Sequence, residues 1–142
     1  MPVLEKTAQA DILVLASPIF LMDVSAQMKA FLERLIFPFS TYETGYKTIA
    51  PKRCDVATIY TMNVPKEMFP EAVIANIESF IGHVFNRPNR ICAFNTYQFS
   101  DYSKYVVEVF DEESKRKYRE DKFPIELESA FNLGMKMAEN IG

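Results

Sequence analysis

The sequence of 142 residues lacks the features that define several large classes of protein. It contains two cysteines, one histidine and no CxxC pair, which excludes a disulfide framework and argues against a Cys/His zinc site. It has only four glycines, and neither glycine-rich phosphate-binding pattern, GxGxxG or GxxxxGK[ST], occurs in it. No apolar run approaches the roughly 20 residues of a membrane helix. We therefore expect no metal and no membrane association.

The overall composition is that of a globular protein. Hydrophobic residues make up 49% of the chain and charged residues 25%, and the length suits one domain spanning residues 1–142. A net charge of −3 gives no general attraction to phosphate backbones, so nucleic acid is not an expected partner. The first residues lack the basic region and apolar core of a secretory signal, which predicts a cytoplasmic location.

Short apolar runs alternate with helical periodicity along the chain. The runs are continuous rather than alternating, as in parallel strands that are covered on both faces. The order of elements predicts an open parallel α/β sheet with right-handed crossovers. We expect strands at Ile12–Ala16, Val56–Tyr60 and Ile91–Phe94, and helices at Val24–Ile36, at Pro70–Phe85 and from Pro124 onward.

Two helices have further expected features. Asp23 or Ser25 can cap the start of the first, and Pro38 ends it. The last helix is expected to bury one apolar side, formed by Leu127, Ala130, Phe131, Ala138 and Ile141. Between them, residues 111–121 mix both signs of charge at helical spacing, which is typical of an exposed face.

The turns that follow the three strands are the places to look for a ligand, because open parallel sheets bind ligands at the carboxyl ends of their strands. These turns, residues 17–22, 61–65 and 95–99, combine small hydroxyl or amide side chains with an aromatic residue or methionine. Such a mixture suits a flat ring with a polar edge. A structural interpretation also stands, in which Pro18 and Pro65 only end strands and the aromatic residues belong to the core.

One segment favours the ligand interpretation. Residues 10–20 read ADILVLASPIF and residues 24–34 read VSAQMKAFLER. They resemble the third strand, flavin loop and third helix of the flavodoxin-like NAD(P)H-dependent FMN reductase family, whose usual pattern is A-D-x, a hydrophobic strand, S-P-x-Y/F and S-A-Q-x-K-x-F-x-D/E-R. That family includes the iron-sulfur flavoproteins and the multimeric flavodoxin-like quinone reductases. Residues 59–63, 101–105 and 123–134 are also similar to it, so the resemblance covers almost the whole chain.

The resemblance implies an FMN-binding oxidoreductase that takes electrons from NAD(P)H and passes them to a quinone, a flavin or another small acceptor. The flavin performs the chemistry in such enzymes, so no catalytic side chain is implied. The flavin ring would lie against the first strand end, with Phe20 as a ring contact, above the start of the following helix and beside the second strand end. The implied FMN-binding residues are Ser17, Pro18, Ile19, Phe20, Ser25, Ala26, Thr61, Met62 and Asn63.

The sequence also departs from the family pattern. Members begin with two βα units, about 60 residues that include the loop around the FMN phosphate. No such units precede Ile12, so we expect the C-terminal two-thirds of the flavodoxin-like fold, with about three strands. The cysteines of the iron-sulfur members lie in the same absent region. Where the family has Gly-Asn or Gly-Ser, this chain has Leu21-Met22-Asp23, and we expect the Asp23 side chain to point away from the flavin.

Two further interpretations follow from this departure. The alternative function is a non-catalytic truncated domain, acting as a subunit or as an inactive fragment. Without its usual neighbour, the apolar run Ile12–Ala16 becomes an edge strand with no lysine or proline to block pairing. This predicts a homo-oligomer, most simply a two-fold dimer that buries Ile12–Ala16 and Val24–Ile36. A lesser alternative assigns Arg116, Lys117 or Arg119 to NAD(P)H phosphates.

Overall fold

The fold is built on one mixed sheet. The computed structural model describes residues 2–141, so Met1 and Gly142 lie outside the described residues. The sheet has four strands in the order β2-β1-β3-β4. Strands β1 (Ile12–Phe20), β3 (Asp55–Thr61) and β4 (Asn89–Ala93) are parallel, and the short β2 (Asp23–Val24) runs antiparallel to the end of β1. The predicted open α/β sheet with three parallel strands is confirmed.

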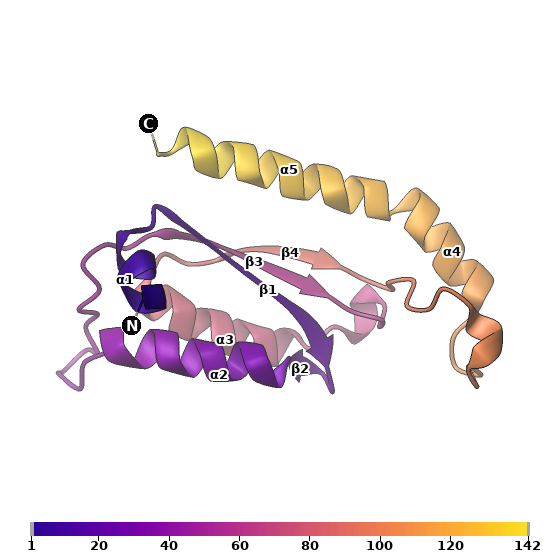
Figure 1. The fold of residues 1–142 in the computed structure, drawn as a ribbon, viewed down its shortest axis with the longest axis horizontal. Helices are drawn as coiled ribbons and strands as arrows, with labels where there is room; N and C mark the ends of the chain where they lie inside the picture. The colour runs from indigo at the N-terminus through magenta and orange to yellow at the C-terminus, as the bar shows by residue number, and fades with distance from the viewer. Residues whose placement is uncertain (1, 142) are drawn as a thin grey trace.

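Helices lie on both faces of the sheet (Figure 1). Helices α2 (Ala26–Ile36) and α3 (Glu71–Val84) cover one face, and α5 (Phe123–Glu139) runs across the other. Helix α1 (Pro2–Gln9) leads into β1, and α4 (Glu112–Asp121) joins α5 beyond the end of β4. Three short 3-10 helices, η1 (Phe37–Phe39), η2 (Lys66–Met68) and η3 (Tyr102–Lys104), lie in the connections. The layers are those of a flavodoxin-like fold.

The core lies between the sheet and the helices α2 and α3. Apolar side chains at helical spacing on each helix pack against the inward side chains of β1 and β3, and each fully buried aliphatic side chain contributes about 1.5–3 kcal/mol. The main contributors are Leu15, Leu32, Leu35, Val56, Tyr60, Ile74, Ile77, Ile81, Val84 and Phe85.

Helix α2 ends at Ile36 as predicted, but it begins at Ala26 rather than at Val24, which belongs to β2. The hydroxyl of Ser25 accepts a hydrogen bond from the backbone N–H of Met28 at 3.2 Å, so Ser25 rather than Asp23 is the cap. The carboxylate of Asp23 accepts instead from the N–H of Val24 at 2.7 Å. Pro38 lies inside η1, immediately after the helix.

Strand β1 is longer than predicted. The sequence placed its end at Ala16 and a turn over residues 17–23, but the strand continues to Phe20. The chain then reverses at Leu21 and Met22, whose φ angles of 49° and 65° lie in the left-handed region. Two-residue hairpin turns with both central residues in this conformation usually use Asn or Gly there, so Leu21 and Met22 do not mark the hairpin in the sequence.

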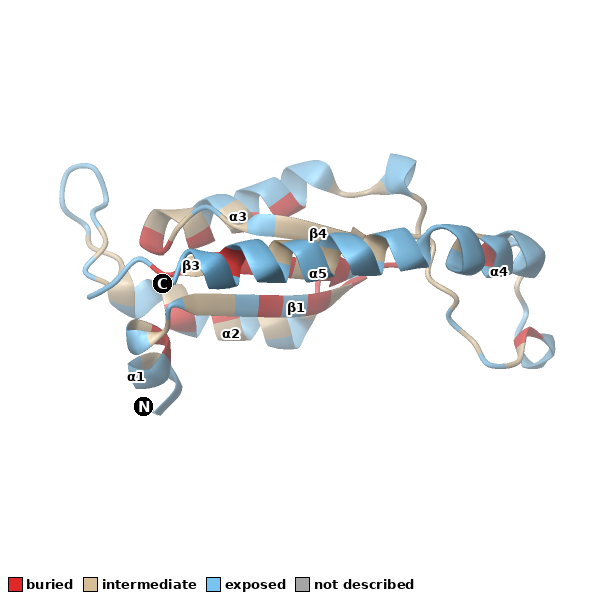
Figure 2. Cartoon of the chain, turned by 90° about the horizontal axis from the view of Figure 1, so that it is seen from above, coloured by how far each residue is buried: buried red, intermediate tan, exposed pale blue. Residues whose placement is uncertain are grey.

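The second face of the sheet is less covered than predicted. Figure 2 shows α5 over the sheet, and its contacts with strands are concentrated on β4. Val14 of β1 is 56% exposed as a result, and Ala16 is exposed beside it. The expectation that β1 is covered on both faces is therefore wrong for the described residues. It holds best for β3, where Val56, Ala57 and Thr58 are all buried.

The buried side of α5 also differs from the prediction. Leu127, Phe131 and Ile141, expected to be buried, are 54%, 68% and 49% exposed. The side nearest the sheet carries the half-buried residues Glu126, Ala130 and Leu133 and the buried Met137. Because α5 lies over an edge strand, only a narrow stripe of it meets the sheet, and of the expected residues that stripe includes only Ala130.

Candidate functional site

The carboxyl ends of the three parallel strands meet at one edge of the sheet. Pro18 pairs with Thr61, and Thr61 pairs with Ala93, so the segments that follow β1, β3 and β4 lie beside one another. The sequence-predicted site residues all belong to the first two segments or to the start of α2. The structure thus brings the predicted residues to one edge, although residues 17–20 form strand rather than loop.

At the end of β1, the ring of Phe20 is available for a ligand, whereas the side chain of Ser17 is not. Ser17 is buried, and its hydroxyl accepts from the N–H of Ser25 at 3.0 Å and donates to the carbonyl of Pro18 at 2.8 Å. These bonds hold the start of α2, including Ala26, against the strand end. Ile19 is buried in the core, whereas Phe20 is 62% exposed.

At the end of β3, the backbone groups of Met62 are hydrogen-bonded, but the side-chain acceptor of Asn63 is not. The N–H of Met62 donates to the carbonyl of Ala93 at 3.0 Å, and the carbonyl of Met62 accepts from the N–H of Thr96 at 3.0 Å. The Oδ1 atom of Asn63 is buried and has no hydrogen-bond partner among residues 2–141. A buried acceptor without a donor is costly, which suits a site where a ligand supplies the missing N–H. Thr61 is exposed next to it.

Lys115 of α4 ties these segments together, a role that the sequence did not reveal. The residue is 2% exposed, and its ammonium donates to the carbonyl of Asn63 at 3.0 Å, to Oδ1 of Asn95 at 2.8 Å and to the carbonyl of Thr96 at 3.4 Å. Nζ also lies 4.8 Å from the ring centre of Phe110. Burial lowers the pKa of Lys115 below its ordinary value.

The remainder of the charged run behaves as predicted. Its side chains are exposed except for Lys115 and the half-buried Tyr118. Arg116 is paired with Glu113 and with Glu120, the latter at 2.8 Å. Lys115 sits among similar charges in the sequence, and nothing in the local pattern sets it apart as buried.

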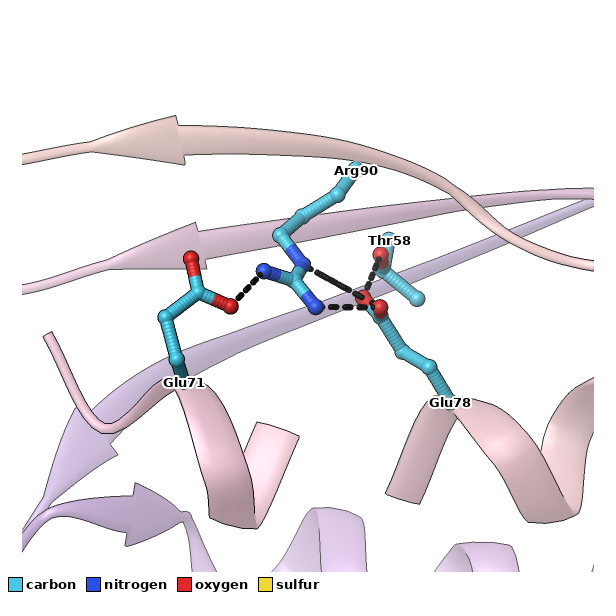
Figure 3. Close-up of polar contacts among 4 residues, drawn as sticks. All are labelled: Thr58, Glu71, Glu78 and Arg90. Carbon is cyan, nitrogen blue, oxygen red and sulfur yellow. Dashed lines mark hydrogen bonds and ion pairs between the residues drawn. The ribbon is translucent and has the colours of Figure 1, made fainter. Parts of the chain in front are cut away.

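A half-buried cation, Arg90, lies away from the strand ends (Figure 3). Its guanidinium donates to both carboxylate oxygens of Glu78, from Nη2 at 2.6 Å and from Nε at 3.0 Å, and to Glu71 from Nη1 at 2.6 Å. The buried hydroxyl of Thr58 also donates to Glu78, at 2.8 Å. These bonds raise the pKa of Arg90 above its ordinary value. The cluster joins α3 to β3 and β4 and leaves no unpaired charge for a ligand.

Two cavities differ in their relation to the predicted site. The larger, of about 1050 Å³, lies between α2, α3 and residues 40–46 and contains none of the predicted site residues. The smaller, of about 290 Å³, lies at the ends of β3 and β4 and includes Thr61. No group of three or more His, Cys, Asp or Glu side chains is placed to hold a metal within residues 2–141. No helix in this range is long and apolar enough to cross a membrane.

Comparison with known proteins identifies a family match for one segment and solved structures with a similar fold. Residues 2–54 match the family described as NADPH-dependent FMN reductase. No curated protein matches the sequence. Among solved structures, an FMN-dependent NADH-azoreductase from Bacillus anthracis str. Ames Ancestor, in complex with FMN, superposes with a TM-score of 0.62 at 11% identity, over 93% of this chain and 60% of the azoreductase. An NADPH-quinone reductase from P. pentosaceus gives 0.53 at 14% identity, over 77% of this chain and 74% of the reductase.

The chain therefore spans about 60% of the length of the azoreductase that it resembles. At these identities the structural likeness concerns the fold, and the family match concerns the segment that includes α1, β1, β2 and α2. That segment contains the strand end from Ser17 to Phe20 and the capped start of α2, which carry the sequence resemblance to the FMN reductase family. Residues 2–54 thus carry the pattern of the NADPH-dependent FMN reductase family, and the chain as a whole has the flavodoxin-like fold.

Proposed function

We propose that this chain binds FMN at the carboxyl edge of its sheet and takes part in NAD(P)H-dependent electron transfer to a quinone, a flavin or another small acceptor. The observation that carries the proposal is the exposed Phe20 ring at the end of β1, inside the segment that matches the reductase family. The partnerless acceptor of Asn63 supports it, because a flavin ring has both an apolar face and an N–H edge. Both features fit the ring portion of FMN.

Each proposed binding residue has a role that follows from its position. FMN, when bound, supplies the redox chemistry, by accepting electrons from NAD(P)H and releasing them to the acceptor. Phe20 stacks on the ring and Asn63 Oδ1 accepts from its edge, while Thr61 borders it. The side chain of Met62 is buried in the core, so only its backbone lies at this edge. Ser17, Pro18 and Ile19 form the strand end, and Ser25 and Ala26 place the start of α2 beneath it. Lys115 fixes the carbonyl of Asn63 and so positions that residue.

A non-catalytic role is the alternative. The sequence contains no phosphate-binding pattern, and the chain covers only part of the azoreductase. In that case the fold would serve as a subunit and the exposed Phe20 would contact protein rather than flavin. FMN binding by the isolated chain separates the two functions.

Phe20→Ala tests the proposal, with Leu21→Ala as the matched control because Leu21 is adjacent and fully exposed. Loss of the stacking ring should weaken FMN binding by about 1–3 kcal/mol. The unfolding free energy should hardly change, since the ring lies largely outside the core. Titration of FMN fluorescence measures the affinity, and urea unfolding measures the stability. Wild-type protein that leaves FMN fluorescence unaltered would favour the non-catalytic role, and equal losses in the two variants would remove Phe20 from the site.

We also propose that the chain self-associates through β1. Among the described residues, β1 pairs on its outer edge only with β2, at Ile19 and Phe20, so the edge from Ile12 to Pro18 is open. The exposed Val14 and Ala16 lie on the same strand. An open apolar edge favours pairing with another chain. Light scattering at micromolar concentration tests this, and a monomer of 16.4 kDa would contradict it. The cytoplasmic location and the single domain stay predictions from the sequence.

A further inference from the structure

The smaller cavity, at the ends of β3 and β4, has walls that are mostly aromatic. It occupies about 290 Å³ and is closed on one side by the end of α4 and the start of α5. Four rings line it, those of Phe94, Tyr97, Tyr118 and Phe123, together with Arg119 and the strand-end residues. Its size is close to the lower end of small-molecule sites, and flat apolar walls favour a flat ring.

The two tyrosines are held in place by carboxylates outside the cavity lining. Tyr97 donates its hydroxyl proton to Glu112 at 2.6 Å, and Tyr118 donates to Glu126 at 2.9 Å. Glu126 also accepts from the N–H of Phe94, at 3.4 Å, so the Tyr118 ring is joined to the end of β4. Burial, together with the hydrogen bond to Glu126, raises the pKa of Tyr118 to about 12. Each tyrosine ring is therefore anchored through its hydroxyl.

Arg119 brings to this cavity a positive charge that has no direct ion-pair partner among the described residues. Its guanidinium lies 5.8 Å from the ring centre of Tyr97, and no carboxylate pairs with it among residues 2–141. Arg116, one turn earlier on α4, is paired with two glutamates and does not line the cavity. A planar guanidinium binds a carboxylate through two parallel hydrogen bonds, which is stronger and more directional than binding by a lysine.

We propose that this cavity is a binding site for an aromatic carboxylate, whose ring packs between the tyrosine and phenylalanine rings and whose carboxylate pairs with Arg119. The site adds to the proposed flavin site, with which it shares only Thr61. It also assigns Arg119 a role at the sheet edge that does not depend on the phosphates of NAD(P)H. No step of the proposal requires FMN to be present.

Binding of 2-naphthoate to the FMN-free protein tests the proposal, with 2-naphthamide as a neutral ligand of the same shape. Calorimetry should show naphthoate bound at least tenfold more tightly than naphthamide. Arg119→Met should weaken naphthoate binding at least tenfold, and Arg119→Lys less. Lys117→Met is the matched control, because Lys117 is exposed on the same helix and outside the cavity, and it should change the affinity less than twofold.

Three outcomes would overturn the site: no naphthoate binding by the wild type, equal affinity for the neutral ligand, or equal losses in Arg119→Met and Lys117→Met. Circular dichroism of each variant shows that the fold is intact, as expected for an exposed arginine. Protein that fails to bind FMN but binds naphthoate through Arg119 would refute the proposed flavin function while supporting this site. The two proposals therefore fail separately.

Discussion

The half-buried Arg90 and the fully buried Lys115 are satisfied in opposite ways. Arg90 lies against α3 with two carboxylates, those of Glu78 and Glu71, and its side chain is 23% exposed. Lys115 lies at the strand ends, is 2% exposed, and donates only to neutral oxygens. The charge of Arg90 is therefore paired with carboxylates within the fold, whereas the charge of Lys115 has no carboxylate partner.

This difference in pairing indicates that Arg90 stabilises the fold, whereas Lys115 lies at an edge suited to ligand binding. Arg90, Glu78 and Thr58 fasten a helix to the middle of the sheet, and a ligand would gain nothing from their charges. Lys115 costs free energy to bury because no carboxylate offsets its desolvation. Part of that cost is offset because Lys115 orders three loop acceptors, and Lys115 and Arg119 together place two cations at the carboxyl edge. An anionic group that pairs directly with such a cation gains a charge-assisted hydrogen bond.

The largest effect is expected when the Arg90 cluster loses its central carboxylate. Glu78→Gln leaves the half-buried guanidinium of Arg90 with only the more exposed Glu71, and should lower the unfolding free energy by about 2–4 kcal/mol. Glu71→Gln is the matched control on the same helix and the same arginine. The Glu71 side chain is 69% exposed, against 12% for Glu78, so its loss should cost about 1 kcal/mol or less. Urea unfolding followed by circular dichroism measures both losses of stability. Equal losses would mean that the Arg90–Glu78 pair contributes no more to stability than the exposed Arg90–Glu71 pair.

Removal of the second cation should cost less. Lys115→Met removes an unfavourably buried charge but leaves the carbonyls of Asn63 and Thr96 and Oδ1 of Asn95 without their donor. The net loss should be about 1–2 kcal/mol in urea unfolding. Lys117→Met, which removes a solvent-exposed charge from the same helix, should change stability by less than about 0.5 kcal/mol. If Lys115→Met proves as costly as Glu78→Gln, Lys115 is compensated by a charge and the contrast between the two clusters is wrong.

The smallest expected effect is a difference in pH dependence. Lys115 has a lowered pKa in the folded chain, so between that pKa and its ordinary value the unfolded chain binds more protons. Stability that depends on Lys115 therefore rises with pH in this window, and Lys115→Met lacks the rise. The cost of the substitution should grow from pH 7 to pH 10. Arg90 has a raised pKa and contributes no slope there.

The wild type and Lys115→Met share other groups whose titration lowers stability as pH rises. Burial raises the pKa of Cys92 to about 11, and Tyr118 behaves similarly, which lowers stability as pH rises. Unfolding of wild type and Lys115→Met at each pH cancels these contributions in the difference. A cost that is constant or falls between pH 7 and pH 10 would show that Lys115 is not titrated in the way its burial implies.

The elements of the fold that depend on local hydrophobic periodicity and capping could be predicted from the sequence. Periodicity located the parallel strands and helices α2 and α3, and Ser25 was correctly one of two candidate caps. The hairpin after β1 could not be predicted, because Leu21 and Met22 adopt left-handed angles that the pairing of β1 with β2 imposes. The site residues of the two strand ends come together by parallel register, which a sequence pattern indicates only through the fold.

The polar contacts that distinguish the two clusters lie beyond sequence pattern. Glu78 and Arg90 are twelve residues apart on different elements, and Lys115 reaches a carbonyl fifty-two residues earlier in the chain. In the sequence, Lys115 resembles its charged neighbours, and only packing at the end of the sheet decides which of them is buried. The apolar side of α5 was misjudged for the same reason, because the surface that it faces is an edge strand.

The narrow attachment of α5 has a consequence for the timescales on which the chain opens. Helix α5 buries only Met137 fully among its described residues, and its strand contacts are concentrated on β4. Cooperative units held by little apolar burial open at a lower free energy than the core. We therefore expect the backbone amides of α4 and α5 to exchange with deuterium together and well before those of β3. The aromatic cavity would then admit its ligand by undocking of this helical arm, while the sheet stays folded.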